Sequence, residues 1–175
     1  VWENNMQQKS VPHIEPYNSK NGYVRITFQP DFHRFNMDTL SDDDTSRVME
    51  RRVIDVAGVN PQLDVQLNGK KVPISDTFGS YASLYQSKIN KEPIICKPNN
   101  RWEVCVMPSP DGIFEQFSFV NSLTTFRGGT HVNVIADQIA RNLAQQINSK
   151  HGKILDHPVT PMQVKSHMWL FVKCL

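Results

Sequence analysis

Cysteine and long apolar runs are both scarce in this sequence. Its 175 residues include three cysteines, an odd number that contains no C-x-x-C pair. That count indicates a reducing compartment and argues against a disulfide framework or a zinc ribbon. No apolar run approaches the roughly 20 residues of a membrane span, and the first residues lack the pattern of a signal peptide. These absences argue against a secreted mini-protein and a membrane protein.

Charge is nearly balanced in total but unevenly distributed. Lys and Arg number 19 against 17 Asp and Glu, and a formal net charge of +2 is too small to indicate a nucleic-acid binder. From residue 141 onward there are five bases and one acid. Lys150, His151 and Lys153 lie together at the predicted end of a helix. Such cations either compensate the helix dipole or contact a phosphate backbone, and composition does not separate the two.

The motifs of common active sites are missing. The sequence has no Walker loop, no H-E-x-x-H, no G-x-S-x-G and no kinase signature. Cys96 and Cys105 fall in or beside predicted strands, and we interpret them as ordinary buried thiols. The six histidines are scattered without the spacing of metal ligands, so no metal site is predicted.

Alternation of apolar and polar residues predicts most of the strands. Val24, Ile26 and Phe28 alternate with more polar neighbours until a proline ends the run. Asn68-Gly69 is typical of a type I′ hairpin turn and joins two further alternating runs. The predicted strands are residues 23–28, 63–67, 72–74, 101–107, 114–121 and 169–175.

Three helices are predicted from apolar residues at helical spacing. The first begins at Ser41 and the acids at 42–44, which supply an N-cap and favourable charge, and Gly58 is its natural stop. The second covers residues 78–90, and the longest covers residues 130–150. Their predicted buried residues are Met49, Val53, Val56 and Ala57; Tyr81, Leu84, Tyr85 and Ile89; and Val132, Ile135, Ile139, Leu143 and Ile147.

The order of these elements indicates the fold class. Strands and helices are interleaved, but several neighbouring strands are linked as hairpins. A mixed or antiparallel sheet with its helices on one face, in two layers, fits this order better than a doubly wound parallel sheet. The predicted class is α+β.

One loop has an unusual sequence. Gly128 and Gly129 directly precede the longest predicted helix, which begins at Thr130 and His131. Two glycines at a helix N-terminus are suited to cradle a phosphate with backbone N–H groups. They are also typical of a tight turn with positive φ, followed by Thr130 as the N-cap. The spacing favours the turn.

Several blocks in a fixed order carry a family resemblance. The hallmark is the strand and loop at residues 117–125, continued by G-G-T-H-V at residues 128–132. The other blocks are residues 27–31 with Phe35 and Met37, and residues 68–71, 81–85, 101–105 and 164–169. Together they resemble the transducer domain of type IIA DNA topoisomerases, and in detail they are more similar to eukaryotic topoisomerase II than to a bacterial gyrase B subunit. The resemblance extends over the chain from about Trp2.

This resemblance implies a left-handed βαβ unit in a fold shared with a small-subunit ribosomal protein and the GHMP kinases. In the family, the domain follows a GHKL ATPase domain and relays nucleotide state to the DNA-cleaving core. Residues 1–22 are then a linker from a missing N-terminal GHKL ATPase domain, and residues 23–175 are a transducer domain truncated at its C-terminal end. The chain opens without Met and closes inside an apolar run, which also suggests a piece of a longer polypeptide.

The resemblance also implies which residues carry function. The parent is expected to be an ATP-hydrolysing isomerase that uses ATP and Mg²⁺, acts on double-stranded DNA as a homodimer in the nucleus, and has no membrane contact. The relay lysine of a Q-T-K loop would follow Leu175, so this fragment alone is predicted to be inactive and to hold no catalytic residue, cofactor or metal. Lys150 and Lys153 are the candidate DNA-binding residues, for weak backbone contacts, although the lysine-rich cluster of many relatives is diluted here. The matching structural motif is Asn121, Ser122, Gly128, Gly129, Thr130 and His131.

Two other functions are compatible with parts of the sequence. A small-molecule kinase of the same fold would need a Gly/Ser-rich phosphate loop, which is not visible. A stand-alone nucleic-acid-binding module would need a stronger basic face with exposed aromatic residues. We interpret Trp2, Trp102 and Trp169 as packing residues instead.

Overall fold

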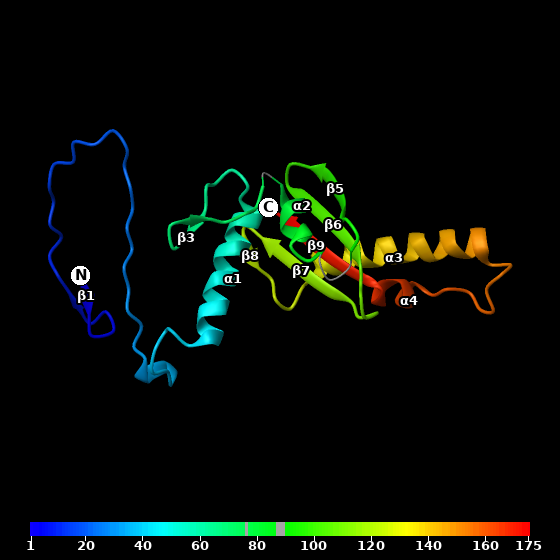
Figure 1. Ribbon diagram of the computed structural model, residues 1–175, viewed down its shortest axis with the longest axis horizontal. Helices are drawn as coiled ribbons and strands as arrows, with labels where there is room; N and C mark the ends of the chain where they lie inside the picture. Colours follow the sequence, from blue (N-terminus) through cyan, green and yellow to red (C-terminus); the bar gives the residue numbers. More distant parts are fainter. Residues whose placement is uncertain (76, 87–89) are drawn as a thin grey trace. The chain divides into compact units, whose positions relative to one another are not determined.

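The chain divides into two compact units, residues 1–46 and residues 47–175 (Figure 1). The computed structural model describes residues 1–75, 77–86 and 90–175. The first unit holds a two-residue ladder between β1 (Trp2–Glu3) and β2 (Gln8–Lys9), and a 3₁₀ turn, η1 (His33–Phe35). Most of its residues are exposed to solvent, so this unit has little core of its own.

The strand predicted at residues 23–28 does not form in this unit. Val24, Ile26 and Phe28 are exposed, and no ladder includes them in the described part of the chain. Alternation marks a strand only when a neighbouring strand pairs with its backbone and a core covers its apolar face. The first unit supplies neither, so the prediction was wrong here.

Helix α1 (Asp43–Val59) confirms the first predicted helix. The residues predicted to start and stop it, however, do not have those roles. The backbone N–H of Thr45 donates to Oδ1 of Asp42 at 2.9 Å, so Asp42 rather than Ser41 acts as the N-cap. This hydrogen bond from Thr45 lowers the pKa of the Asp42 carboxyl. Gly58 lies inside the helix, where an added Cβ would come within 2.4 Å of the Tyr81 ring. Gly58 therefore permits close packing and does not stop the helix.

A five-stranded sheet forms the centre of the second unit, in the order β5–β6–β9–β7–β8. All neighbours are antiparallel except β7 and β9, which are parallel. The strands are β5 (Ile94–Asn99), β6 (Trp102–Pro108), β7 (Glu115–Val120), β8 (Leu123–Thr124) and β9 (Met168–Cys174). The mixed sheet confirms the predicted α+β class.

Three predicted strands correspond to β6, β7 and β9. The predicted hairpin is also present, but its second strand lies at residues 70–71 and not at the predicted residues 72–74. Strand β3 (Gln66–Leu67) pairs with β4 (Lys70–Lys71) across the Asn68-Gly69 turn, in which both residues have positive φ. The edge strands β5 and β8 were not predicted. β5 has no alternation of apolar and polar residues, and β8 has only two residues, so neither gives a periodic signal.

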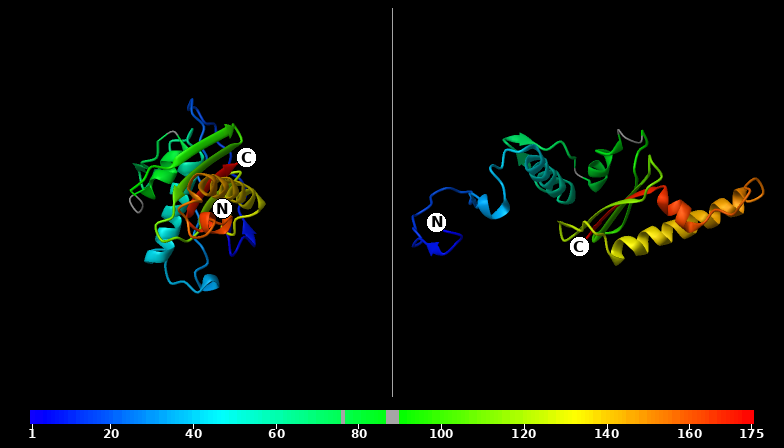
Figure 2. Two further views of the ribbon diagram at one scale, coloured as in Figure 1. Left: turned by 90° about the vertical axis from the view of Figure 1, so that its right-hand side faces the viewer. Right: turned by 90° about the horizontal axis from the view of Figure 1, so that it is seen from below.

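Two buried clusters cover opposite faces of the sheet. On β6 and β9, Cys105, Met107, Trp169 and Phe171 alternate with residues that point to the other face. The first cluster also contains Val59 at the end of α1 and residues of α2 (Phe78–Ser83). The second is packed by α3 (Thr130–His151), which lies along the sheet on the side away from α2 (Figure 2). Helices therefore pack on both faces, which corrects the expectation of helices on one face.

The β7–α3–β9 connection is the βαβ crossover that the resemblance implies. It links two parallel strands that are direct neighbours in the sheet. A short helix, α4 (Pro161–Ser166), precedes β9 and begins with a capping box between Thr160 and Gln163. Lys165 of α4 forms an ion pair with Asp137 of α3 at 2.8 Å, which ties the two helices together.

Helix α2 is shorter than predicted. It ends at Ser83 instead of continuing to residue 90. Tyr81 is buried as expected and Tyr85 packs against the same cluster, whereas Leu84 is exposed. The predicted core residue Ile89 lies outside the described residues.

The buried stripe of α3 differs from the predicted one. The residues of this helix that are buried are Val132, Ala136, Ala140 and Ala144. Ile135 and Ile139 are half-buried beside this stripe, and Leu143 is 42% exposed. Alanines bring the helix axis close to the sheet, so the larger side chains point to the flanks. The placement of Leu143 in the core was therefore wrong.

The cysteines also divide by environment. Cys105 and Cys174 are buried in the sheet, and burial raises the pKa of the Cys105 thiol to about 12. Cys96 lies on the edge strand β5 and is exposed, which corrects its interpretation as a buried thiol.

The three tryptophans also differ in environment. Trp169 is buried and Trp102 is half-buried, as predicted for packing residues, but Trp2 is exposed.

Substitutions on α3 test this register. Ala140→Leu should destabilise the fold by about 1–3 kcal/mol, because the added atoms have no room between helix and sheet. Leu143→Ala should cost about 0.5 kcal/mol or less, because this side chain is largely in solvent. Urea unfolding of the two variants and the parent chain measures both effects. A larger loss for Leu143→Ala than for Ala140→Leu would contradict the described register.

Candidate functional site

The turn between β7 and β8 is fastened to the end of α1. Asn121 and Ser122 form this turn with φ of +49° and +64°, as a type I′ hairpin requires. The Ser122 hydroxyl donates to Oδ1 of Asn60 at 3.0 Å, and Arg52 donates to the Ser122 carbonyl at 3.2 Å. Of the two predicted motif residues in this turn, Ser122 thus makes the contact between the sheet and the helix.

Asp55 is the centre of a second set of contacts in the same place. Its side chain is 4% exposed and accepts from Nε of Arg51 at 2.9 Å and from the Tyr81 hydroxyl at 2.7 Å. Thr124 of β8 donates to the other carboxylate oxygen at 3.4 Å. Arg51 also donates to the Tyr81 hydroxyl at 3.1 Å. One carboxylate therefore joins α1, α2 and β8.

The protonation states in this cluster follow from burial. Desolvation raises the pKa of Tyr81 well above its usual value, so its hydroxyl stays neutral and donates to Asp55. Desolvation alone would lower the pKa of Arg51, but the hydrogen bond to Asp55 and nearby tyrosines outweigh it and the pKa rises. The guanidinium therefore remains charged and paired with the buried carboxylate.

Aromatic rings connect this cluster to the core. The Arg51 guanidinium lies 5.8 Å from the ring centres of Tyr85 and Phe117. Phe117 stacks on Phe171 with ring centres 4.6 Å apart, and Tyr85 packs on Phe117 at 4.5 Å. The polar contacts of Asp55 are thus continuous with the hydrophobic face of the sheet.

The glycine loop before α3 is filled by its own neighbours. Gly128 and Gly129 have φ of +67° and +155°, and a Cβ on Gly129 would come within 2.9 Å of the His131 ring. His131 is also within 3.2 Å of the Thr125 hydroxyl. Gly129 is the N-cap and Thr130 the first residue of the helix, so Thr130 does not cap it as predicted. These contacts support the interpretation of the loop as a tight turn.

Lys150 and Lys153 lie at the other end of α3 from this loop. Lys150 is in the last turn of the helix, Lys153 follows it, and both are exposed. Neither belongs to an ion pair found among residues 1–75, 77–86 and 90–175. The structure therefore does not bring these lysines together with the Gly128–His131 loop.

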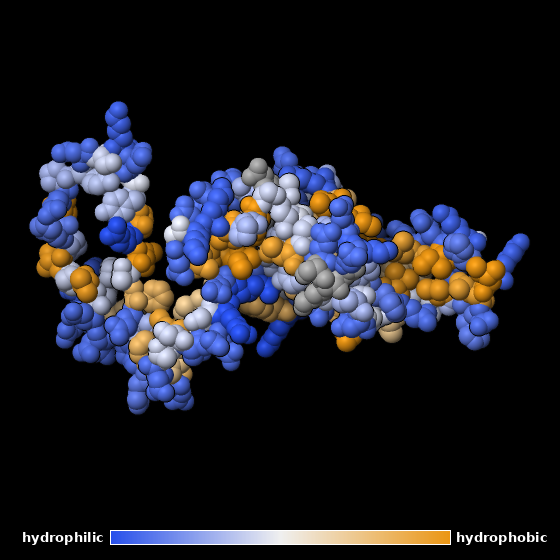
Figure 3. All heavy atoms as spheres, viewed as in Figure 1, coloured by the Kyte–Doolittle hydropathy of each residue, from blue (hydrophilic) through white to orange (hydrophobic). Residues whose placement is uncertain are grey.

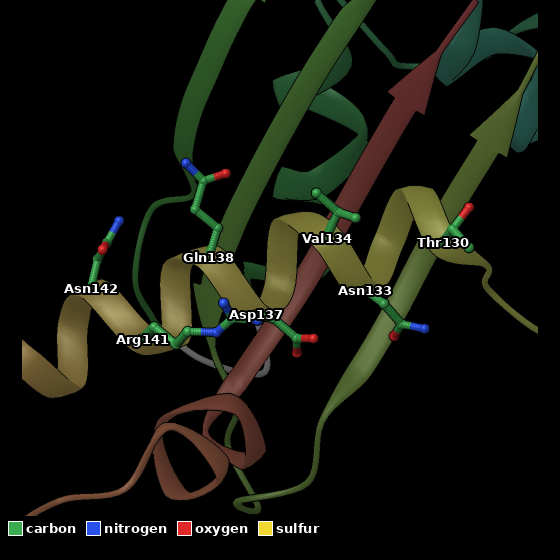
Figure 4. A pocket seen from close by; sticks show the side chains of 7 residues that line it. All are labelled: Thr130, Asn133, Val134, Asp137, Gln138, Arg141 and Asn142. Carbon is green, nitrogen blue, oxygen red and sulfur yellow. The ribbon is translucent and has the colours of Figure 1, made fainter.

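The outer face of α3 is mainly polar. A hollow of about 380 Å³ runs along it, and the side chains in Figure 4 project from successive turns of this one helix. Figure 3 also shows hydrophobic residues, in orange, along the α3 and α4 region. Ile154, between these two helices, and Met162 of α4 are both exposed. The hollow is lined by Thr130, Asn133, Val134, Asp137, Gln138, Arg141 and Asn142.

The described residues hold neither a metal-binding cluster nor a membrane-spanning helix. There, no group of three or more His, Cys, Asp or Glu side chains is placed to hold a metal ion. Within the same ranges, no helix has the length and hydropathy needed to cross a membrane.

Sequence reasoning missed the residues around Asp55. Arg51 and Asp55 are spaced i, i+4 on a predicted helix, which is a visible but common ion-pair signal. The partners Tyr81 and Thr124 come from distant segments, so only the folded structure reveals the cluster.

Comparison with known proteins gives consistent matches. A family model described as DNA gyrase B matches residues 65–175. DNA topoisomerase 2 of Arabidopsis thaliana is 41% identical over 183 residues, which cover 100% of this chain and 12% of that protein. The mitochondrial DNA topoisomerase 2 of Dictyostelium discoideum is 39% identical over 191 residues, covering 99% of this chain and 14% of that protein. The chain thus spans only a small part of these relatives.

Two solved structures have a similar fold. The ATPase region of Saccharomyces cerevisiae topoisomerase II superposes with a TM-score of 0.86 and 40% identity, over 99% of this chain and 43% of that one. The ATPase and transducer domains of DNA topoisomerase II from Balamuthia mandrillaris give a TM-score of 0.73 and 41% identity, over 83% of this chain and 36% of that one.

A double-mutant cycle tests the cluster around Asp55. Asp55→Ala should destabilise the unit by about 1–3 kcal/mol, because the buried Tyr81 hydroxyl loses its acceptor. Combined with Tyr81→Phe, the loss should be smaller than the sum of the two single losses by about 0.5–3 kcal/mol. Urea unfolding gives the four free energies, with Glu50→Ala on the exposed side of α1 as control. Additive losses would show that the two side chains are not coupled.

Proposed function

Because the chain belongs to the DNA gyrase B family, we propose that it is part of an ATP-dependent DNA topoisomerase II. In this proposal it contributes the transducer region, which relays ATP binding and hydrolysis to the DNA cleavage core during strand passage. The observation that carries the proposal is the likeness to the ATPase region of yeast topoisomerase II, over 99% of this chain at 40% identity. The parent enzyme would be an isomerase that hydrolyses ATP.

The contacts around Asp55 suit a relay. A relay has to pass a displacement from one element to the next without absorbing it by bending. Arg52 and Asn60 hold the β7–β8 turn against α1, and Asp55 adds Thr124 and Tyr81 to the same junction. A shift of α1 would therefore move the sheet with it.

We also propose the domain limits that the sequence suggested. Residues 1–22 act as a linker from a GHKL ATPase domain, and residues 23–175 belong to the transducer domain. The family match begins at residue 65, inside this proposed domain. The relay lysine of the Q-T-K loop is proposed to follow Leu175 in the parent.

ATP and Mg²⁺ are assigned to other parts of the parent enzyme. The sequence has no Walker loop, and the described residues contain no cluster of three metal-ligating side chains. These residues do not fit a nucleotide–metal site, and this chain alone is proposed to be inactive. The parent is proposed to work as a homodimer in the nucleus, although one similar relative is a mitochondrial enzyme.

Lys150 and Lys153 are the proposed contacts to double-stranded DNA. Both are exposed at the C-terminal end of α3, where cations attract phosphates without a shaped pocket to hold them. Weak backbone contacts of this kind suit a duplex that has to pass through the enzyme. The kinase alternative has no support from any phosphate loop in this sequence.

Nucleotide binding tests the proposed division of labour. Calorimetric titration of the isolated chain with a nonhydrolysable ATP analogue should give no saturable binding tighter than about 1 mM, or roughly −4.1 kcal/mol. A longer protein that includes the preceding ATPase domain serves as the positive control. Tighter binding by this chain alone would overturn the assignment of ATP to other domains.

Salt dependence tests the DNA contacts. Lys150→Ala with Lys153→Ala should flatten the slope of log K against log salt for duplex DNA by up to about 2 units, since each phosphate contributes about 0.9. In the parent enzyme the same change should reduce DNA-stimulated ATPase and leave basal ATPase intact. Lys70→Ala with Lys91→Ala, two other exposed lysines, provides the matched control. An unchanged slope and unchanged stimulation would mean that the lysines only compensate the helix dipole.

A further inference from the structure

A cleft of about 500 Å³ lies between α1 and the segment from β7 to the loop after β8. All of its lining residues belong to the second unit, residues 47–175. This volume is within the range of small-molecule sites, about 300–1,000 Å³. Neither the topoisomerase assignment nor the relay explains why a cleft should remain here.

The cleft has an excess of positive charge. Arg47, Arg51 and Arg52 line it from one side of α1, and Asp55 is the one acidic residue among its lining residues. The Asp55 carboxylate is already occupied by Arg51 and Tyr81. The lining therefore carries two positive charges more than negative ones.

The arginines keep donors available for a ligand. The Arg47 side chain is exposed and takes part in none of the side-chain hydrogen bonds or ion pairs found in the described part of the chain. Arg52 donates one N–H from each terminal nitrogen to Ser122 and Thr124. Because a guanidinium has five N–H donors, the others remain available. Planar guanidinium groups match the geometry of a carboxylate.

Apolar groups face the same space. Val48 and Phe126 line the cleft and are 69% and 87% exposed, and Phe117 contributes a half-buried ring. Exposed aromatic and aliphatic side chains beside a charged cleft are suited to cover a flat ring. The lining thus combines an anion-binding side with an apolar side.

One buried acceptor in the lining lacks a donor. Gln116 fixes its amide by donating from Nε2 to the carbonyls of Thr125 and Phe126, at 3.2 and 3.1 Å. Its Oε1 is buried and has no hydrogen-bond partner within the described ranges. Buried acceptors are normally hydrogen-bonded, because leaving one unpaired costs free energy. A donor from a bound molecule would pair the Gln116 oxygen and remove this cost.

We propose that this cleft is a binding site for a planar aromatic carboxylate. The ring lies against Val48, Phe117 and Phe126, and the carboxylate accepts from Arg47 and from the free N–H groups of Arg51 and Arg52. An N–H on the ring is able to donate to the Gln116 oxygen. The site is separate from the proposed DNA contacts, which lie at the C-terminal end of α3.

The experiment uses indole-3-acetate as probe, because it combines a flat ring, a carboxylate and a ring N–H. Titration of the whole chain, followed by calorimetry or by amide chemical shifts, should give saturable binding that weakens as salt is added. Indole-3-acetamide, which lacks the charge, and acetate, which lacks the ring, should each bind much more weakly.

Exposed residues allow variants that do not disturb the fold. Arg47→Ala and Phe126→Ala should each weaken indole-3-acetate binding by about fivefold. Arg141→Ala and Ile113→Ala remove an exposed arginine and an exposed apolar residue outside the cleft, and they should leave binding unchanged.

Three outcomes would overturn the proposal. They are no saturable binding, equal binding of the acetamide, and equal losses for the variants outside the cleft. If an acidic peptide binds while the aromatic acid does not, the first of these outcomes favours a protein partner. Because the probe is measured without DNA or ATP, failure here leaves the topoisomerase assignment untouched.

Discussion

The position of β9 between β6 and β7 is the constraint on which the second unit depends. This strand pairs antiparallel with β6 along seven residues and parallel with β7 along six. Its residues from 168 to 172 are all buried and alternate between the two clusters. Without β9 the sheet would split into two hairpins, and both hydrophobic clusters would lose their central side chains. Since β9 is the last strand of the chain, the core is completed by a contact of long sequence separation.

The elements that sequence reasoning predicted well are those with a strong period. Strands β6, β7 and β9 and helix α3 are long enough for their apolar pattern to identify them. The pattern failed where a tertiary contact decided the outcome. Gly58 is a helix stop by its chemistry, but the Tyr81 ring packed against it gives it a different role. The strand predicted at residues 23–28 has the right alternation but no partner strand in its unit.

Residue size explains the error on α3. Large apolar residues at positions 135, 139 and 143 suggested that their side of the helix faces the core. In the structure, the side with the alanines at 136, 140 and 144 faces the core. A stripe of small residues gives a weak hydropathy signal but permits the closest approach of helix and sheet. The side of contact was thus set by the distance between the layers, which a single helix sequence does not encode.

The length of α3 gives small motions at one end a measurable effect at the other. Its 22 residues span about 33 Å at a rise of about 1.5 Å per residue. The helix follows its N-cap residue Gly129, which has a φ of +155°, and ends at His151, next to Lys150. A tilt of about 5° about the glycine end would displace the lysine end by about 3 Å, by the geometry of a rigid rod of that length. That distance is similar to the length of a hydrogen bond, so a tilt of this size is enough to make or break a contact between a lysine and a phosphate.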